Sequence, residues 1–221
     1  MSTLTRPEVS SLLQRLFAEA SVADGALRAE LARRSAEERA AFMARARTDY
    51  RGFYGEAKTL FLPVSPETGR LLYVLARATR AKVIVEYGTS FGLSTIHLAA
   101  ALADNGGGRV IGSEFEPGKV VRARAHLAES GLQDLVEIRE GDALETLARD
   151  LPAEIDLVLL DGAKVLYPKI LALLEPRMRA GAIVVADNAD DSPEYLARVR
   201  EPRHGYVSLP FGEDVEISVR A

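Results

Sequence analysis

The chain has 221 residues, a formal net charge of −4 and no cysteine. Its 48% hydrophobic and 27% charged residues are typical of a globular protein with a sizeable core, most simply one domain with added segments. This composition excludes disulfides and cysteine-bound metals, and it argues against a general attraction to nucleic acid or anionic membranes. The sequence holds no apolar run of membrane-spanning length and no signal-peptide core, so we expect a soluble, cytoplasmic protein.

The first sixty or so residues are predicted to be helical. Thr5-Arg6-Pro7-Glu8 is typical of a helix start, and apolar residues at positions 12, 13, 16 and 17 follow at helical spacing. The stretch from Asp24 to Arg51 is rich in Ala, Arg and Glu, which predicts a solvated amphipathic helix. An RNA-contacting face is the alternative, because this stretch carries more basic than acidic residues; the basic ones are Arg28, Arg33, Arg34, Arg39, Arg45, Arg47 and Arg51. Ser65-Pro66-Glu67 predicts the start of a further helix, which runs to about Arg80.

From residue 82 onward, strand and helix patterns alternate. The predicted strands are 82–86, 109–113, 135–139, 155–160 and 182–187, and the predicted helices are 92–104, 117–130, 143–150, 165–179 and 193–200. Such alternation predicts an α/β fold with a parallel, doubly wound sheet that is covered on both faces. The apolar runs 206–209 and 215–219 flank a Pro-Phe-Gly-Glu-Asp turn, which predicts an antiparallel hairpin at one edge of the sheet.

The segment 83–94 joins a strand, a glycine-rich turn and a helix start. It contains Glu86, Gly88 and Gly92 in the pattern E-x-G-x-x-x-G, which differs from the dinucleotide pattern G-x-G-x-x-G. The glycines let a ligand approach the backbone closely, and the helix start offers free N–H groups. An acid before the first glycine repels a pyrophosphate but suits a cationic ligand such as S-adenosylmethionine.

Each of the five predicted parallel strands delivers an acid to the same edge of the sheet, where ligands of open α/β sheets bind; these acids are Glu86, Glu114, Asp142, Asp161 and Asp187. Glu114 is placed to accept hydrogen bonds from ribose hydroxyls, or else to begin the helix near Pro117. Asp142 either faces an adenine amino group or caps the helix that starts at Ala143.

Asp161, Asp187 and Asn188 would converge on one cation if the fourth and fifth strands are neighbours. Two carboxylates and an amide are hard oxygen donors that suit Mg²⁺ or a similar divalent ion. Beside such an ion the pKa of Lys164 should fall, so that this lysine could accept a proton. The alternatives are that Asp161 and Asp187-Asn188 only form a turn and a helix cap, and that Lys164 is a solvated surface lysine.

Together these residues resemble the cation-dependent O-methyltransferases of the catechol and caffeoyl-CoA type. The resemblance covers about Val64 to Val219. Its markers are Glu86-Tyr87-Gly88-Thr89, Gly92, Ser94, Glu114, Leu160-Asp161-Gly162-Ala163-Lys164, Tyr167 and Ala186-Asp187-Asn188. It implies a class I, Rossmann-like methyltransferase with a mostly parallel seven-stranded sheet, a C-terminal antiparallel hairpin and extra N-terminal helices. We therefore expect N-terminal cap, dimer and acceptor-pocket helices over residues 1–63 and a methyltransferase domain over 64–221.

The resemblance also implies S-adenosylmethionine and Mg²⁺ as cofactors, a small aromatic vicinal diol as the methyl acceptor, and often a homodimer. The implied cofactor-binding residues are Val64, Glu86, Gly88 and Ser94 around the methionine end, Glu114 at the ribose, Asp142 and Ala143 at the adenine, and in addition Thr89, Phe115 and Asp161. Asp161, Asp187 and Asn188 match the metal ligands and Lys164 matches the general base. Ala163 departs from the family, because the catechol enzymes place a bulky aromatic residue there, and no acid near Val207 matches their substrate-binding glutamate.

Three other functions fit parts of the sequence. Gly88-Thr89-Ser90-Phe91-Gly92 is a G-x-S-x-G between a strand and a helix, followed by an acid and His204 in the order of a serine hydrolase. That fold, however, needs several strands before the serine. Relatives of the family methylate a hydroxylated uridine in tRNA, and the Arg-rich stretch would be the contact surface of such an enzyme. A non-catalytic nucleotide-binding module is the third function. We interpret the remaining histidines, His97 and His126, as structural.

Overall fold

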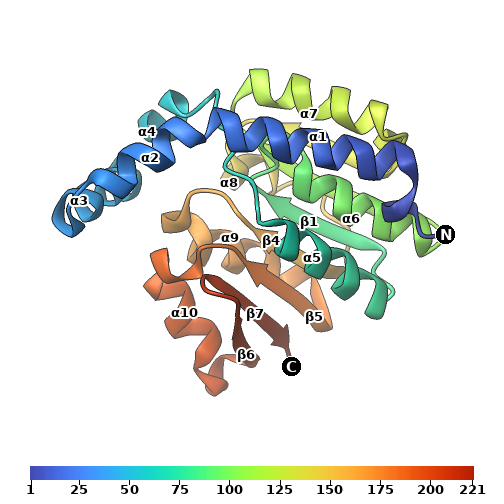
Figure 1. Ribbon diagram of the computed structural model, residues 1–221. Helices are drawn as coiled ribbons and strands as arrows, with labels where there is room; N and C mark the ends of the chain where they lie inside the picture. The colour runs from blue at the N-terminus through green and yellow to red at the C-terminus, as the bar shows by residue number, and fades with distance from the viewer.

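The computed structural model describes residues 1–221, with the side chains of Arg28 and Met43 left out (Figure 1). Seven strands form one sheet in the order β3-β2-β1-β4-β5-β7-β6. Their bounds are β1 Val83–Tyr87, β2 Arg109–Glu114, β3 Val136–Glu140, β4 Ile155–Leu160, β5 Met178–Ala186, β6 Tyr206–Phe211 and β7 Val215–Arg220. β1 to β5 are parallel, and β7 runs antiparallel to both of its neighbours. The predicted doubly wound sheet and the C-terminal hairpin are confirmed.

Ten α-helices surround the sheet and extend beyond it. They are α1 Pro7–Ala23, α2 Gly25–Arg33, α3 Ala36–Thr48, α4 Tyr50–Glu56, α5 Pro66–Ala78, α6 Leu93–Asp104, α7 Pro117–Glu129, α8 Ala143–Thr146, α9 Tyr167–Leu174 and α10 Pro193–Arg200. In Figure 1, α1 lies across α6 and α7 on one side of the sheet, and α9 and α10 lie on the other. Among the helices described, none combines the length and the apolar character that crossing a membrane requires.

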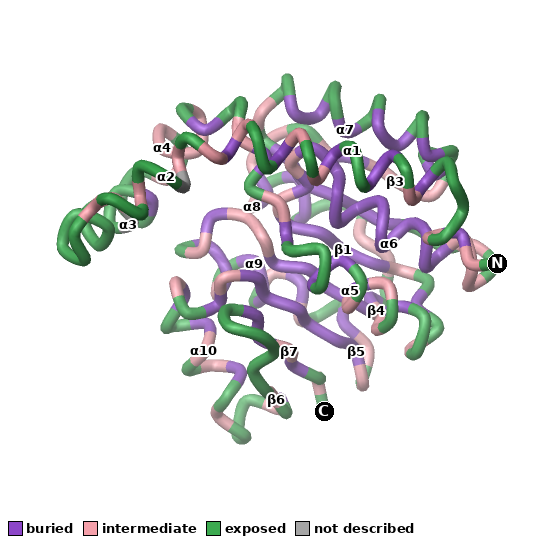
Figure 2. Tube along the Cα trace, in the orientation of Figure 1, coloured by how far each residue is buried: buried purple, intermediate pink, exposed green. Residues whose placement is uncertain are grey.

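Alternating strand residues feed two apolar cores, one on each face of the sheet. Ile84 and Leu157 belong to the core beneath α1, α5, α6 and α7, whereas Val85 and Val158 belong to the core beneath α8, α9 and α10. This follows from the two-residue period of a strand, which sends successive side chains to opposite faces. Figure 2 shows the central strands and α6 as the most continuously buried part of the chain.

Residues 25–62, which contain α2, α3 and α4, form a segment that we call the cap. The cap extends past the carboxyl ends of the strands (Figure 1), and most of its outer surface is exposed (Figure 2). The two ends of this segment are held together by Asp24, whose carboxylate accepts the N–H groups of Phe61 and Leu62 at 2.8 and 2.9 Å. The cap is therefore an excursion of the chain that is closed at its base.

The N-terminal prediction was wrong in one respect: the stretch Asp24 to Arg51 is not one helix. The chain breaks at Ser35, which begins α3 through a capping box with Glu38, and again at Asp49, whose side chain caps α4. The predicted helix 143–150 is only the four residues of α8. The predicted helix 165–179 contains α9 between two short 3₁₀ turns, and β5 begins at Met178 instead of residue 182.

Candidate active site

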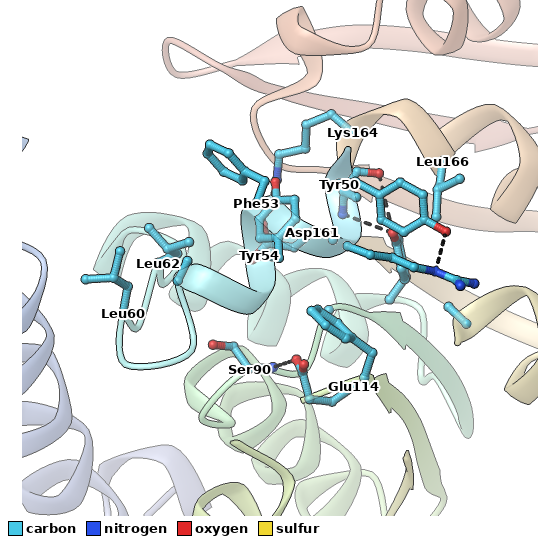
Figure 3. A pocket seen from close by; sticks show the side chains of 18 of the residues that line it. Tyr50, Phe53, Tyr54, Leu60, Leu62, Ser90, Glu114, Asp161, Lys164 and Leu166 are labelled. Atoms are coloured by element: carbon cyan, nitrogen blue, oxygen red, sulfur yellow. Dashed lines mark hydrogen bonds and ion pairs between the residues drawn. The ribbon is translucent and has the colours of Figure 1, made fainter. Parts of the chain in front are cut away.

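A cavity of about 430 Å³ lies between the carboxyl edge of the sheet and the cap. Eight of the residues that the sequence predicted as functional line it: Gly88, Glu114, Phe115, Asp142, Ala143, Asp161, Lys164 and Asn188. The opposite wall comes from the cap and is largely apolar and aromatic; it includes Leu27, Leu31, Phe42, Tyr50, Phe53, Tyr54, Leu60 and Leu62. Figure 3 shows Tyr54 and Phe53 near Asp161 and Lys164, with Ser90 and Glu114 at another part of the cavity.

Two glycines allow the ends of β1 and β4 to meet at the floor of the site. Gly88 has a φ of +100°, and a Cβ on it would lie 2.5 Å from the carbonyl oxygen of Asp161. A Cβ on Gly162 would lie 2.3 Å from the ring of Tyr87. Both positions therefore require glycine, Gly88 because the backbone of Asp161 packs directly on it and Gly162 because the ring of Tyr87 does. This close packing fixes the position of Asp161.

Asp161 and Asp187 lie side by side because of the strand register. They follow Leu160 and Ala186, which are paired partners of β4 and β5. The backbone N–H of Asp187 donates to the carbonyl of Leu160 at 2.9 Å, and that of Asp161 donates to the carbonyl of Tyr87 at 2.8 Å. Tyr167 holds the backbone of Asp187 in place, because its hydroxyl donates a hydrogen bond to the carbonyl oxygen of Asp187 at 2.8 Å. The predicted convergence of the two acids is thus built by the sheet itself.

The acid pair and Lys164 form a buried charge cluster. The Lys164 Nζ donates to Asp161 Oδ1 at 3.1 Å, and the side chains of these residues are only 12% and 10% exposed. Burial together with the charge of Asp161 raises the pKa of Asp187 to about 8, and burial likewise raises the pKa of Asp161. Burial alone would lower the pKa of Lys164, but the neighbouring Tyr167 and Asp161 raise it well above its usual range. These shifts mean that the two acids resist being ionised side by side, and a further cation would favour the ionised form of both.

Asn188 adopts a left-handed conformation with φ +47° and ψ +46°, directly after Asp187. Its amide nitrogen donates to Asp214 Oδ2 at 2.8 Å. The amide oxygen is therefore the atom left to accept from, or bind to, a ligand. Among the described residues, no group of three or more His, Asp or Glu side chains is arranged to hold a metal ion. The metal set of two carboxylates and one amide stays a prediction.

Glu114 and Ser90 are linked at another part of the cavity. Glu114 is 7% exposed, and its carboxylate accepts the N–H groups of Ser90 and Glu116 at 2.8 and 2.9 Å. Ser90 has φ +48° and donates its hydroxyl to the carbonyl oxygen of Phe61 at 2.8 Å. The acid predicted to hold a ribose therefore faces the cavity with a fixed orientation.

Glu86 lies away from the cavity, although the sequence grouped it with the site. It is fully buried, and its carboxylate accepts hydroxyl hydrogen bonds from Thr89, Ser94 and Thr95 at 3.0, 2.6 and 2.6 Å. Burial raises its pKa to about 7, while the three hydroxyls oppose that shift. In this geometry Glu86 orders the turn between β1 and α6 instead of facing a ligand.

The remaining predicted cofactor residues fall into two places. Asp142 caps α8 by accepting the N–H of Leu144 at 2.9 Å, and it also pairs with Arg51 of the cap, so its capping role is present while it lines the cavity. Val64, Thr89 and Ser94 line a much smaller hollow of about 10 Å³, which shares Gly88, Ser90 and Asp161 with the main cavity. The predicted site thus consists of one large and one small adjoining space.

Two groups of site residues were missed by the sequence analysis. The first is the aromatic wall from the cap, for which the run Tyr50-Arg51-Gly52-Phe53-Tyr54 was a usable signal. The second is Lys119 of α7, which is only 6% exposed and faces the cavity. Nothing in the sequence distinguishes Lys119 from a surface lysine of an amphipathic helix.

The structure argues against a serine hydrolase. Ser90 lies at the carboxyl edge of β1, whereas His204 precedes β6. Tyr206 pairs with Arg220, and β7 pairs with β5 such that Val219 opposes Ile183, so the start of β6 lies toward the opposite edge of the sheet. The candidate nucleophile and its candidate base are thus separated by the length of the strands. The other two histidines are buried and structural, as predicted: Nδ1 of His97 and Nδ1 of His126 bond the carbonyl oxygens of Leu93 and Phe91.

Known proteins share this architecture and parts of this sequence. Residues 85–189 match the model of a methyltransferase domain. A catechol O-methyltransferase from Niastella koreensis is 35% identical over 136 residues, which are 60% of this chain and 61% of that protein. The O-methyltransferase from Bacillus cereus, solved in complex with S-adenosylhomocysteine, is 27% identical with a TM-score of 0.65, over 72% of this chain and 83% of that one. The O-methyltransferase TomG from Streptomyces achromogenes, involved in tomaymycin synthesis and solved with S-adenosylmethionine, is 29% identical with a TM-score of 0.64, over 81% and 89% of the two chains.

These matches and the sheet order define the class I, Rossmann-like methyltransferase fold. Within that class, the chain is similar to O-methyltransferases, among them catechol O-methyltransferases. The chain spans about three fifths of the length of the curated relatives it matches.

Proposed function

We propose that this protein transfers a methyl group from S-adenosylmethionine to a hydroxyl group of a small aromatic vicinal diol, with the help of a divalent cation. The observation that carries the proposal is the meeting of Asp161, Lys164 and Asn188 with an aromatic wall in one cavity. The solved relatives with bound S-adenosylmethionine or S-adenosylhomocysteine support the cofactor. The catechol O-methyltransferase relatives support the acceptor class.

The proposed metal ligands fit Mg²⁺ in their chemistry. Asp161 and Asp187 are neighbouring acids whose raised pKa values a bound cation would lower, and the amide oxygen of Asn188 is left as a further hard donor. When bound, Mg²⁺ would lower the pKa of an acceptor hydroxyl and offset the charge of the two carboxylates. Asp161, Asp187 and Asn188 would hold it.

Lys164 is the proposed general base. In the structure its ammonium is ion-paired with Asp161, and its pKa is raised, so it holds its proton. Lys164 can act as a base only when the attraction of Asp161 is weakened, which is why we couple its role to cation binding. Its Nζ would then take the proton from the acceptor hydroxyl, and the predicted fall of its pKa remains part of this proposal.

The cap provides the acceptor wall in this proposal. Ala163 is small where the catechol enzymes place an aromatic residue, and the aromatic residues Tyr50, Phe53 and Tyr54 of α4 line the same cavity. Aromatic side chains bind flat aromatic ligands through stacked or edge-to-face contacts. S-adenosylmethionine supplies an electrophilic methyl group, and the cap would exclude water and hold the acceptor at reacting distance from it.

The tRNA alternative gains no support from the Arg-rich stretch. All six of its arginines whose side chains are described have intramolecular partners: Arg33, Arg34, Arg39, Arg45, Arg47 and Arg51. The side chain of Arg28 lies outside the described residues. Carboxylates offset the charges of four of them, Arg34, Arg45, Arg47 and Arg51, whereas Arg33 and Arg39 bond only carbonyl oxygens. This pairing weakens the attraction of the stretch to a phosphate backbone, so we retain the small aromatic acceptor.

The test is methyl transfer to a panel of 3,4-dihydroxyphenyl compounds, measured with Mg²⁺ and with EDTA. We expect methylated product with Mg²⁺ and none with EDTA. Substitution Asp187→Ala should abolish the Mg²⁺-dependent product while leaving S-adenosylhomocysteine binding, measured by calorimetry, within about twofold. Product that persists in EDTA or in Asp187→Ala would overturn the metal assignment. Absence of product from a protein that binds S-adenosylmethionine would overturn the acceptor class alone.

A homodimer and a cytoplasmic location complete the proposal. Both come from the family resemblance and the composition. Light scattering of the purified protein at micromolar concentration tests the first: a mass of about 48 kDa, twice the 24.0 kDa of the chain, is expected.

A further inference from the structure

Lys119 is a buried lysine without an ion-pair partner. It lies in the first turn of α7, is 6% exposed and lines the cavity. Its Nζ donates one hydrogen bond, to the Ser90 hydroxyl oxygen at 3.3 Å, and lies 5.3 Å from the centre of the Phe91 ring. Among the described side chains, no carboxylate lies within 4.0 Å of this ammonium.

Such a group is costly in the free protein. A buried ammonium loses its hydration, and one long hydrogen bond to a neutral hydroxyl together with the face of the Phe91 ring returns only part of that loss. Burial lowers the pKa of Lys119, while Glu114 and Glu116 oppose the shift from a greater distance. Polar groups that carry this cost without a partner in the free protein are found at functional sites, where a ligand supplies the partner.

The position of Lys119 indicates which ligand group that is. Its partner Ser90 is joined through its N–H to Glu114 and through its hydroxyl to the carbonyl of Phe61. Glu114 is the predicted ribose-binding acid. The chain just after Phe61 reaches Val64, and Val64 and Ser94 line the small hollow predicted for the methionine end. The ammonium therefore lies between the two predicted ends of the cofactor site.

Charge then selects one group of the cofactor. S-adenosylmethionine carries a sulfonium, an ammonium and a single anionic group, the carboxylate of its methionine part. The acids of the cavity suit its cationic groups, and none of them suits its carboxylate. Lys119 is the buried cation on the cofactor side of the cavity, whereas Lys164 is paired with Asp161.

We propose that Lys119 binds the carboxylate of S-adenosylmethionine. The inference rests on the proposed function, because it takes that molecule as the ligand of the cavity. Ser90 acts as a positioning residue: it holds the ammonium near the end of β1 in the free protein and remains beside it when the carboxylate binds. The lysine would discriminate in favour of cofactor analogues that keep the amino-acid part.

The test compares two ligands that differ in that part. S-adenosylhomocysteine has the carboxylate, and 5′-methylthioadenosine lacks the whole amino-acid end. We expect Lys119→Met to weaken S-adenosylhomocysteine binding, measured by calorimetry without acceptor, at least tenfold. Binding of 5′-methylthioadenosine should change less than twofold. Lys58→Met, which removes an exposed lysine of the cap, is the matched control and should change neither affinity.

Equal losses for both ligands would assign Lys119 to the nucleoside or to the fold, and unchanged S-adenosylhomocysteine binding would remove it from the site; either result overturns the inference. Failure of the wild-type protein to bind either ligand would overturn the proposed function and this inference together. Binding by the wild type without methyl transfer to the diol panel would overturn only the acceptor.

Thermal unfolding of the free protein gives an independent readout. A lysine kept for a ligand destabilises the free fold, so Lys119→Met should leave the Tm without ligand unchanged or raise it, while the increase in Tm caused by S-adenosylhomocysteine becomes smaller. A lysine with a purely structural role would lower the Tm of the free protein and leave the ligand-induced increase intact. Lys119→Gln provides a second variant that keeps a polar tip.

Discussion

At the scale of single residues, the site is defined by which buried charges have partners. Asp161 is paired with Lys164, and Glu86 is satisfied by three hydroxyls. Lys119 has only neutral partners, the hydroxyl of Ser90 and the ring of Phe91. The same physical cause, burial, raises the pKa of the acids and lowers that of Lys119. The residues that chemistry and binding would use are thus those for which the fold alone does not provide full compensation.

Lys164 offers the most direct test of the chemistry. Lys164→Met removes the proposed base but keeps the length of the side chain, so we expect kcat to fall by about 10²- to 10⁴-fold. S-adenosylhomocysteine affinity should stay within about twofold. Lys169→Met, an exposed lysine of α9, is the control and should leave kcat unchanged. A loss of cofactor affinity as large as the loss of kcat would contradict the role as base.

His97 predicts a specific dependence of stability on pH. Burial lowers the pKa of His97 from 6.5 to about 4, so between these values the unfolded chain binds a proton that the folded one excludes. Stability contributed by the neutral ring is complete above pH 6.5 and is lost as the pH falls. The loss is about 1.4 kcal/mol per pH unit, or about 2 kcal/mol between pH 6.5 and 5.

The measurement is urea unfolding of wild type and His97→Leu at pH 7.5 and pH 5. We expect the wild type to lose about 2 kcal/mol more than the variant over this interval. The pKa of Glu86 is raised to about 7, so this acid makes the protein more stable as the pH falls, which is the opposite of the effect of His97. Glu86 is present in both proteins, and its effect therefore cancels in the comparison. Equal pH slopes for the two proteins would show that His97 titrates normally.

At the scale of elements, the junction of β1 and β4 is the least tolerant part of the site. Gly162 has an ordinary φ, but an added Cβ would meet the ring of Tyr87 at 2.3 Å. Gly131 has a φ of +70° and open space around it. The two glycines therefore separate a steric requirement from a conformational one.

We expect Gly162→Ala to lower the free energy of unfolding by about 3 kcal/mol or more and to reduce cofactor binding, because Tyr87 and the end of β4 must shift. Gly131→Ala should cost only about 1 kcal/mol and leave binding unchanged. Urea unfolding and calorimetry measure both quantities. Similar costs for the two variants would contradict the close packing at Gly162.

Helix α4 supplies the aromatic wall that is proposed to bind the methyl acceptor. Tyr54 lines the cavity, and the nearby charges of Lys164, Asp161 and Asp191 all act on its phenol, whose pKa is raised mainly by burial. Tyr54→Ala should raise the KM of the acceptor about tenfold or more without changing S-adenosylhomocysteine affinity. Tyr54→Phe separates the ring from the hydroxyl. An unchanged acceptor KM in Tyr54→Ala would remove α4 from the acceptor site.

The elements also show what the sequence could and could not predict. The parallel strands were predicted to within one or two residues, apart from the early start of β5, because buried β-branched runs carry a clear pattern. The separate helices of the cap were not predicted from the sequence, since these charged and Ala-rich helices carry no regular apolar stripe. The breaks were visible in principle, as Ser35 with Glu38 and as Asp49.

The site residues also divide into those that a sequence pattern predicts and those that it does not. The convergence of Asp161 and Asp187 was predictable because neighbouring strands end together. The cofactor role of Glu86 stays a prediction: the two-residue period puts its side chain on the face of Ile84, under α6, where it bonds Thr89 and Ser94 beside the small hollow. Lys119 could not be predicted, because whether a lysine is buried depends on a turn and a cap that lie far away in the sequence.

At the scale of the whole molecule, both ends of the chain belong to the central fold: α1 packs on one face of the sheet, and β6 and β7 form one of its edges. α1 packs into the same core as α6 and α7, so the helical N-terminus is partly an integral layer of the fold and partly the projecting cap. The predicted division between residues 63 and 64 stays a prediction. It separates the cap from the sheet but also separates α1 from the core it helps to form.

Cation binding should be measurable as a property of the whole fold. A ligand that binds only the folded protein stabilises it by about 2.7 kcal/mol at one hundred times its Kd, so millimolar Mg²⁺ should raise the Tm by several degrees and EDTA should reverse the increase. Asp187→Asn should lose most of the increase, whereas Glu194→Gln, in the first turn of α10, should keep it. An equal Mg²⁺ effect in both variants would place the cation elsewhere.

The hydrogen bonds of Phe61 and Leu62 to Asp24 hold the two ends of the cap together, so the cap can be replaced as one unit. One carboxylate holds the chain where it leaves α1 and where it returns at Phe61 and Leu62. The entropy lost on closing the loop between these points grows only slowly with the number of residues in it, so the length of the cap can vary at little cost in stability. An ancestor could therefore exchange residues 25–60 by recombination and acquire a new acceptor without disturbing the methyl-donor half. The same two anchor points mark where a designer would graft a foreign cap onto this sheet.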